Sequence, residues 1–226
     1  MDAVTLAFAL HFIVIGYTLG SDFVVDQRTF YLLGAQDVTP AERSRLLRSI
    51  LFSDQHPRMG LIGFIATGIT LESLLGVSPL TVEQLPLVWL IAAVWFAEVW
   101  ISFLNEDKRW GHGLVNADVV WRYLLAATFL LVALWSLLAD GPLHADWLAI
   151  KYLLLAVLIG GGVSVRFCVR ALTAAWPDYL ANGSTLGFEA TLQQSLKRAI
   201  YITWSIWGLY LAMALLTVFR PGGSTA

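Results

Sequence analysis

The apolar segment LHFIVIGYTLGSDFVVDQR at 10–28 carries three ionisable side chains before its final arginine, and they are His11, Asp22 and Asp26. On a helix that turns 100° per residue, His11 and Asp22 fall on one line with Thr18, and Asp26 continues that line. A charged side chain near the bilayer centre costs about 2.5–3.5 kcal/mol on insertion scales. The segment therefore predicts a helix with one polar stripe, which must face protein or water because lipid cannot solvate it.

Depth along the predicted helices places His11 together with two other ionisable residues. His11 lies roughly a third of the way into its segment, at about 1.5 Å per residue. Glu72 lies late in a second apolar segment, and Lys151 lies early in a fifth, so both reach a comparable depth. We expect His11, Glu72 and Lys151 to form an outer cluster. It either binds a cofactor or consists of ion pairs that fix helix register.

A second set of charges lies near the other face of the predicted bundle. It combines acidic residues with arginines and consists of Asp22, Asp26, Glu98, Arg122 and Arg166. The charges nearly balance, which favours buried ion pairs over a catalytic site. Arg122 is the expected partner of Glu98, although an intramembrane glutamate can also relay protons.

His11 is also a candidate axial ligand to b-type haem or a ligand to a copper ion. A five-coordinate haem needs only one histidine, whereas copper favours nearby sulfur ligands. The sulfur-containing residues form no recognisable cluster in the sequence; they are Met1, Met59, Met213 and Cys168. His56 and His112 are expected at the opposite face, and His144 reaches His11 only if its loop folds inward. The alternative is a hydrogen-bonded core histidine without a ligand.

The composition indicates that lipid is the solvent of this chain. Its 226 residues are 58% hydrophobic and 13% charged, with a mean hydropathy of +0.71. Soluble domains carry about 25% charged residues. The net charge of −2 gives no reason to expect nucleic acid as a partner. The single cysteine excludes an intramolecular disulfide and multi-cysteine metal sites.

Six segments are long and apolar enough to cross a bilayer, which takes about 20 residues. The predicted fold is an all-α integral membrane protein with one transmembrane domain over 1–226. The predicted spans are 3–25, 58–77, 86–104, 119–139, 147–169 and 199–219. The first span lacks the basic N-terminal region of a secretory signal, so we expect it to be retained.

The polar segments between these spans carry further predictions. The segments 26–57 and 170–198 are expected as long polar connections, and Pro177 as a residue beyond a helix end. Within the first of them, Thr39 and Glu42 form a capping-box pattern that predicts a helix over 40–54. This helix has one apolar face, so it lies either on the membrane surface or against neighbouring segments.

The distribution of basic residues predicts the orientation. With both termini outside, Lys151 and Arg220 are the two of 14 cations on the outer side. The other twelve lie inside, as the positive-inside rule requires. They are Arg28, Arg43, Arg45, Arg48, Arg58, Lys108, Arg109, Arg122, Arg166, Arg170, Lys197 and Arg198.

A shift of 140 residues aligns the first two predicted spans with the last two. It places His11 on Lys151, Gly20 on Gly160 and Arg58 on Arg198. This alignment predicts a parallel repeat about an axis along the membrane normal. In the first span, Gly16 and Gly20 also form a GxxxG pair, which permits close approach of another helix.

Short motifs of the chain resemble a group of small bacterial membrane proteins. They are His11 with the glycines after it, RMGLIGFIATGITL at 58–71, and the Lys151 that opens a later helix. The group comprises copper-resistance-D-like proteins and HemJ-type, haem-binding protoporphyrinogen oxidases. The resemblance implies a multi-pass protein of the bacterial inner membrane, with His11 as ligand of haem or copper and Lys151 as the recurrent lysine.

Three functions follow as hypotheses. The leading one is a redox protein that binds b-type haem or a metal in the outer cluster. The second is a transporter or channel for ions or protons, with the polar stripe of the first helix lining its path. The third is a non-catalytic subunit or assembly factor that associates with other membrane or redox proteins, because little of the chain lies outside the membrane.

Overall fold

The computed structural model describes residues 2–143 and 145–219, and within them the chain forms seven α-helices and one short 3-10 helix. The elements are α1 (Ala3–Gly34), α2 (Pro40–Ser53), α3 (Gln55–Leu74), η1 (Val82–Gln84), α4 (Leu85–Leu104), α5 (Arg109–Leu138), α6 (Asp146–Asn182) and α7 (Leu186–Phe219). These residues contain no strand, which confirms the all-α fold class.

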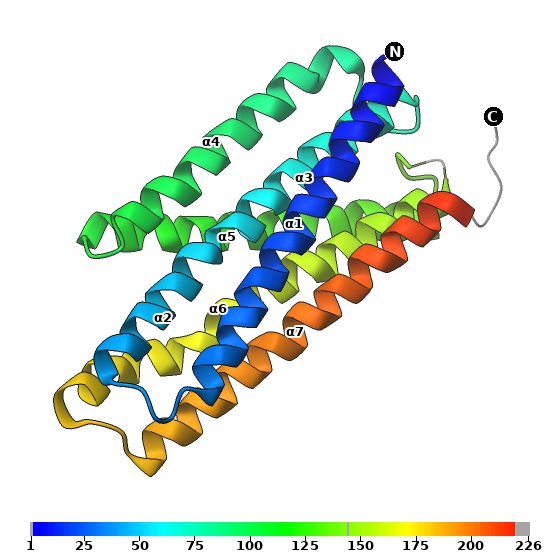
Figure 1. Cartoon of the computed structure of the whole chain (residues 1–226). Helices are drawn as coiled ribbons and strands as arrows, with labels where there is room; N and C mark the ends of the chain where they lie inside the picture. The colour runs from blue at the N-terminus through cyan, green and yellow to red at the C-terminus, as the bar shows by residue number, and fades with distance from the viewer. Residues whose placement is uncertain (1, 144, 220–226) are drawn as a thin grey trace.

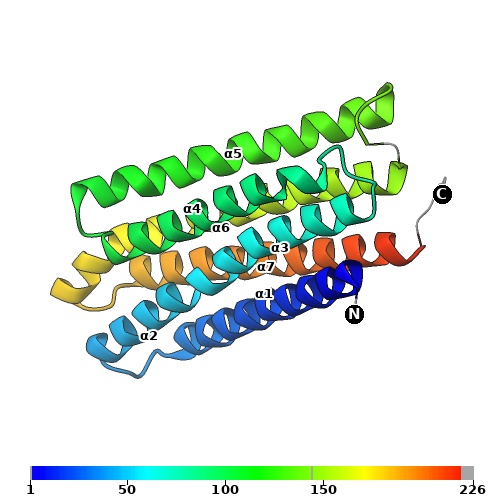
Figure 2. The same ribbon diagram turned by 90° about the horizontal axis from the view of Figure 1, so that it is seen from above.

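The six longer helices run alternately up and down in one bundle (Figures 1 and 2). Contacts connect α1 to α3, and then each helix to the next from α3 to α7, and α1 also contacts α7. One end of the bundle holds the start of α1, η1 and the end of α7, and we call it the terminal end. The opposite end holds α2 and the turn between α6 and α7, and we call it the α2 end.

Five of the helices are long and apolar enough to cross a membrane, and they are α1, α4 with η1, α5, α6 and α7. Large apolar side chains such as Phe12, Ile13 and Leu131 cover their outer surfaces, at 64–67% exposure. Exposed apolar surface of this extent requires a lipid environment. The chain is therefore an all-helical protein of the multi-pass membrane type, in contact with the bilayer.

Helix α3 differs from the other long helices because it lies inside the bundle. Thirteen of its 20 residues are buried, against five of the 32 residues of α1. A helix of 20 residues measures about 30 Å, which matches the hydrocarbon thickness. Since protein covers most of α3, its composition need not be as apolar as that of a lipid-facing helix. Its predicted role as a sixth span stays a prediction.

The connection expected over 170–198 and the placement of Pro177 beyond a helix end are wrong, because helices continue through most of this segment. Helix α6 extends to Asn182, with Pro177 inside it, and α7 begins at Leu186. Apolar residues recur there every three or four positions, as in an amphipathic helix. They form a second core with α1 and α2, made of Leu32, Leu47, Ile50, Leu172, Trp176, Tyr179, Phe188, Leu192 and Leu196.

The structure confirms the helix predicted over 40–54, and it also shows what that helix packs against. Thr39 and Glu42 form the expected capping box. Arg43 of α2 is buried and forms an ion pair with Glu189 of α7, with 2.5 Å between Nη1 and Oε1. The hydrogen bonds that Arg43 donates to the Glu189 carboxylate raise the pKa of its guanidinium above the usual value. Helix α2 thus docks on α7 and, through the second core, on α6.

The predicted internal repeat stays a prediction. Helix α2 separates α1 from α3, whereas residues 183–185 connect α6 directly to α7. The two halves thus differ by one helix. The 140-residue shift superposes His11 on Lys151, and both residues lie in the half of the bundle toward the terminal end.

Candidate functional site

A cleft of about 370 Å³ opens between α1, α3, α6 and α7 in the half of the bundle nearest the terminal end. His11, Glu72 and Lys151 line it together, so the structure brings the three members of the predicted outer cluster into one site. The remaining walls are largely apolar and include Phe8, Phe12, Ile15, Phe64, Leu71, Met213, Leu215 and Val218. Such a cleft suits a mostly apolar ligand that a few polar groups orient.

His11 is held in one orientation by α3. Its Nδ1 lies 2.8 Å from Thr67 Oγ1, and its ring stacks on Phe64 with 4.9 Å between the ring centroids. The Thr67 hydroxyl donates its only proton to the carbonyl of Gly63 at 2.7 Å, so its oxygen accepts the bond from His11 Nδ1–H. That tautomer leaves a lone pair on Nε2. A second-shell bond at Nδ1 is the usual way in which proteins orient a histidine ligand.

The other two members of the cluster have partners of their own. The Tyr152 hydroxyl donates to Glu72 Oε2 at 2.9 Å, and Glu72 is buried. Lys151 Nζ lies 5.6 Å from the centroid of the Trp147 ring, as in a cation–π contact. A smaller cavity beside the cleft shares His11, Glu72 and Lys151 with it and has Tyr152 in its wall.

Two residues of the site did not follow from the sequence. Met213 lines both the cleft and the smaller cavity, although the sequence placed no sulfur near His11. Tyr210 lies one helical turn before it and packs edge-on against Phe64, with centroids 4.9 Å apart. Their spacing along α7 shows that they share one face, but only the fold shows that this face adjoins His11.

Other metal-ligating residues do not supplement this site. Among residues 2–143 and 145–219, no group of three or more His, Cys, Asp or Glu is close enough to hold a metal ion. His56 instead bonds to the Tyr17 hydroxyl, with 2.6 Å between the hydroxyl oxygen and Nδ1. His144 and Arg220, which the sequence placed at the outer side, lie outside the described residues. A ligand that needs a single histidine fits this donor set better than a bare metal ion.

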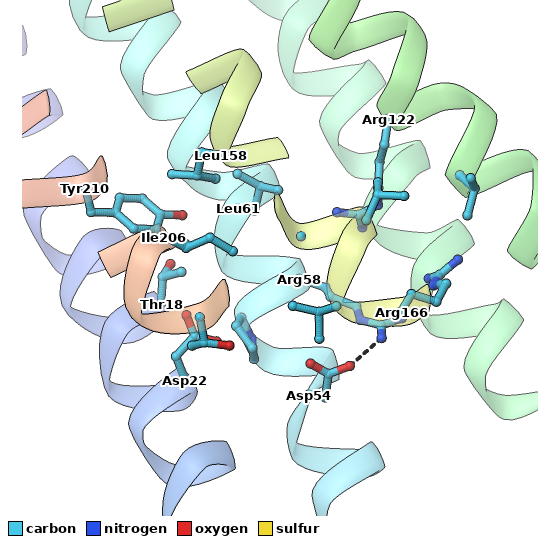
Figure 3. A pocket seen from close by; sticks show the side chains of 16 residues that line it. Thr18, Asp22, Asp54, Arg58, Leu61, Arg122, Leu158, Arg166, Ile206 and Tyr210 are labelled. Carbon is cyan, nitrogen blue, oxygen red and sulfur yellow. Dashed lines mark hydrogen bonds and ion pairs between the residues drawn. The ribbon is translucent and has the colours of Figure 1, made fainter. Parts of the chain in front are cut away.

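A second, more polar cavity of about 70 Å³ lies between α1, α3, α5, α6 and α7 toward the α2 end. Figure 3 shows its charged lining, in which Arg58 pairs with Asp54. Asp22, Arg122 and Arg166 also line it. Tyr210 points its hydroxyl into this cavity and also borders the outer cleft (Figure 3). One aromatic side chain thus lies between the two cavities.

The expected pairing of Glu98 with Arg122 is wrong in this structure, because Asp118 takes the place of Glu98. Arg122 Nε lies 2.9 Å from Asp118 Oδ2, and Arg166 Nη2 lies 3.1 Å from the same oxygen. Trp95 Nε1 donates to Asp118 Oδ1 at 2.9 Å. Both oxygens of Glu98 are buried and, in the described structure, have no hydrogen-bond partner. The sequence missed Asp118 because it lies just before the predicted span 119–139, whereas α5 already begins at Arg109.

Asp22 and Asp26 are also bonded differently from what the sequence suggested. Trp207 Nε1 donates to Asp22 at 3.3 Å, and Trp204 Nε1 donates to Asp26 at 3.0 Å. Both tryptophans belong to α7, so the two aspartates of the polar stripe bond to α7, whereas His11 bonds to α3. Arginines were the expected partners. Of the two aspartates, only Asp22 lines the polar cavity in which the arginines lie.

No family model matches the chain, and no curated protein and no solved structure is significantly similar to it. The resemblance to copper-resistance-D-like and HemJ-type proteins therefore stays a prediction from short motifs.

Proposed function

We propose that the protein binds b-type haem in the outer cleft, where His11 Nε2 would hold the iron. The orientation of His11 carries this proposal: Thr67 holds Nδ1 as a donor, so that Nε2 keeps its lone pair in a largely apolar cleft. Bound haem would supply one-electron redox chemistry. In this proposal the chain has six spans in a bacterial inner membrane, with both termini outside.

Other residues that line the cleft are also suited to haem. Met213 also lines the cleft, and its thioether would be able to bind the haem iron. Lys151 offers an ammonium group that suits a haem carboxylate. The aromatic side chains of Phe8, Phe12 and Phe64 suit the flat macrocycle.

The optical spectrum of protein purified from haem-supplied cells tests this proposal. We expect a Soret band at about one haem per chain, and we expect His11→Ala to lose it. His112→Ala is the matched control, because His112 is exposed at the start of α5 and lies outside the cleft. A preparation without a Soret band, or a His11→Ala variant with an unchanged spectrum, contradicts the proposal.

A second candidate function is proton or ion transport, and the position of Tyr210 favours it. A polar cavity toward the α2 end and a cleft toward the terminal end meet at this one residue. Asp22 lines the former and His11 the latter, so the ionisable groups of α1 lie on both sides of Tyr210. A side chain that borders both cavities could act as the gate of such a path.

Liposomes with an internal pH dye test the second candidate. A potassium diffusion potential should drive proton uptake that depends on the protein, and Asp22→Asn should abolish it. Asp107→Asn is the control, because Asp107 is exposed in the turn between α4 and α5. Equal flux in Asp22→Asn and in the unmodified protein argues against transport along this path.

A further inference from the structure

A groove separate from the outer cleft and from the polar cavity lies on the outward face of α1 near the α2 end. It has a volume of about 620 Å³ and is bordered by α2 and by the start of α3. Its lining consists of Gly16, Tyr17, Gly20, Ser21, Val24, Arg28, Ser49, Phe52, Ser53 and His56. Gly16, Gly20, Val24 and Phe52 are exposed, so the groove opens toward lipid.

The end of this groove next to α2 is basic and rich in hydroxyl groups. Arg28 Nη1 donates to the carbonyl oxygen of Ser49 at 3.1 Å and to the hydroxyl of Ser53. Among the residues that the structure describes, no carboxylate forms an ion pair with Arg28. Its remaining N–H groups are therefore available to an anion, and guanidinium is well suited to phosphate.

The other end of the groove holds Gly16 and Gly20, with Tyr17 and Ser21 beside them. A Cβ atom added at Gly16 or at Gly20 would meet nothing within 4 Å, so no other helix of this chain packs on the GxxxG pair. The two glycines and Val24 continue the groove from Arg28 toward the middle of the bundle. Twelve residues of helix separate Gly16 from Arg28, about 18 Å at 1.5 Å per residue. Half of the hydrocarbon thickness is about 15 Å.

We propose that this groove binds one anionic phospholipid from the leaflet next to α2. Its phosphate contacts Arg28 and the hydroxyl of Ser53, and one acyl chain lies along Gly16 and Gly20. Charge complementarity selects this occupant: with α1 across the membrane, Arg28 lies toward the interface, and the track of Gly16, Gly20 and Val24 extends from it toward the bilayer centre. A transmembrane helix packed on the GxxxG pair would contact Gly16 and Gly20 but would leave Arg28 without an anion.

Binding of phosphatidylglycerol to the purified, delipidated protein tests the proposal by native mass spectrometry. We expect one tightly bound molecule, and at least tenfold weaker binding of phosphatidylcholine. Arg28→Gln should weaken phosphatidylglycerol binding about tenfold. Arg45→Gln is the matched control, because Arg45 is an exposed arginine on α2 outside the groove. Equal binding by Arg28→Gln and Arg45→Gln overturns the proposal.

A second pair of variants tests the acyl track. Gly20→Leu places a side chain in open space, so it fills the groove without a clash inside the protein. We expect it to reduce phosphatidylglycerol binding, whereas Gly208→Leu, at an exposed glycine of α7 with equally open space, leaves binding intact. Unchanged binding by Gly20→Leu contradicts the assigned acyl track.

Two further outcomes identify a different occupant. Displacement of the lipid by millimolar inorganic phosphate would show an anion site without a role for the acyl chain. A dimer that Gly20→Leu dissociates, with lipid binding unchanged, would show that the groove packs against a second copy of the chain. Either result overturns the proposal, and neither depends on whether the outer cleft binds haem.

Discussion

At the scale of single residues, Asp118 organises the charges of the bundle toward the α2 end. Its carboxylate is 2% exposed and accepts hydrogen bonds from Trp95, Arg122 and Arg166, which belong to α4, α5 and α6. Arg122 is also buried, at 4% exposure. Removing one partner from a buried pair leaves an uncompensated charge, which costs about 3–5 kcal/mol.

We therefore predict that Asp118→Asn lowers the free energy of unfolding by about 3 kcal/mol. Thermal unfolding in detergent measures the change. Asp107→Asn makes the same chemical substitution in an exposed turn and should leave the midpoint nearly unchanged. Equal midpoints for the two variants would show that the pairing with Arg122 and Arg166 contributes little.

A second prediction concerns the hydrogen bond that orients His11. Thr67→Val keeps the shape of the side chain but removes the acceptor for Nδ1–H, so the ring is free to rotate. Loss of a second-shell partner typically weakens ligand binding about 10- to 100-fold. If the outer cleft binds haem, titration with haem should show that Thr67→Val binds it about 10- to 100-fold more weakly. Thr70→Val, one turn away and bonded to Trp89 instead, should bind haem like the unmodified protein.

At the scale of helices, the approach of α1 to α3 depends on Gly60. A Cβ atom there would lie 2.2 Å from the Thr18 hydroxyl and 3.2 Å from the Thr18 Cα. The second of these atoms is backbone, so one helix must shift. The glycine therefore sets how closely the two helices that carry His11 and Thr67 can pack.

Gly60→Ala should accordingly destabilise the protein by about 1–3 kcal/mol, in spite of the higher helix propensity of alanine. Gly208→Ala introduces the same methyl group into open space on α7 and should stabilise or leave stability unchanged. Unfolding midpoints measured side by side decide the matter. A Gly60→Ala variant as stable as Gly208→Ala would contradict the close contact.

At the scale of the whole molecule, we predict that α3 crosses the membrane as a sixth span. If it does, the turn between α1 and α2 and the turn after α3 lie on opposite sides. Single cysteines at Asp37 and at Ser78, in a chain with Cys168 replaced, report this with a membrane-impermeant maleimide. We expect label at Ser78 from outside and none at Asp37. Label at both positions, or at neither, would exclude α3 as a span.

The sequence by itself determined the class of the protein and much of its polar chemistry. Oily segments of about 20 residues predict membrane helices because lipid cannot hydrogen-bond to the backbone. Helix rise alone placed His11, Glu72 and Lys151 at one depth, and the structure shows all three around one cleft. The capping box of α2 was also predictable from the sequence, since its two side chains are three residues apart.

Only the tertiary structure decided which charged groups bond to which. Asp118, rather than Glu98, holds Arg122, and tryptophans of α7 hold Asp22 and Asp26. Depth along a helix is a property of one segment, whereas the rotation of each helix about its axis follows from packing against its neighbours. The same rotation turns Met213 and Tyr210 toward the cleft and leaves Gly16 and Gly20 facing lipid.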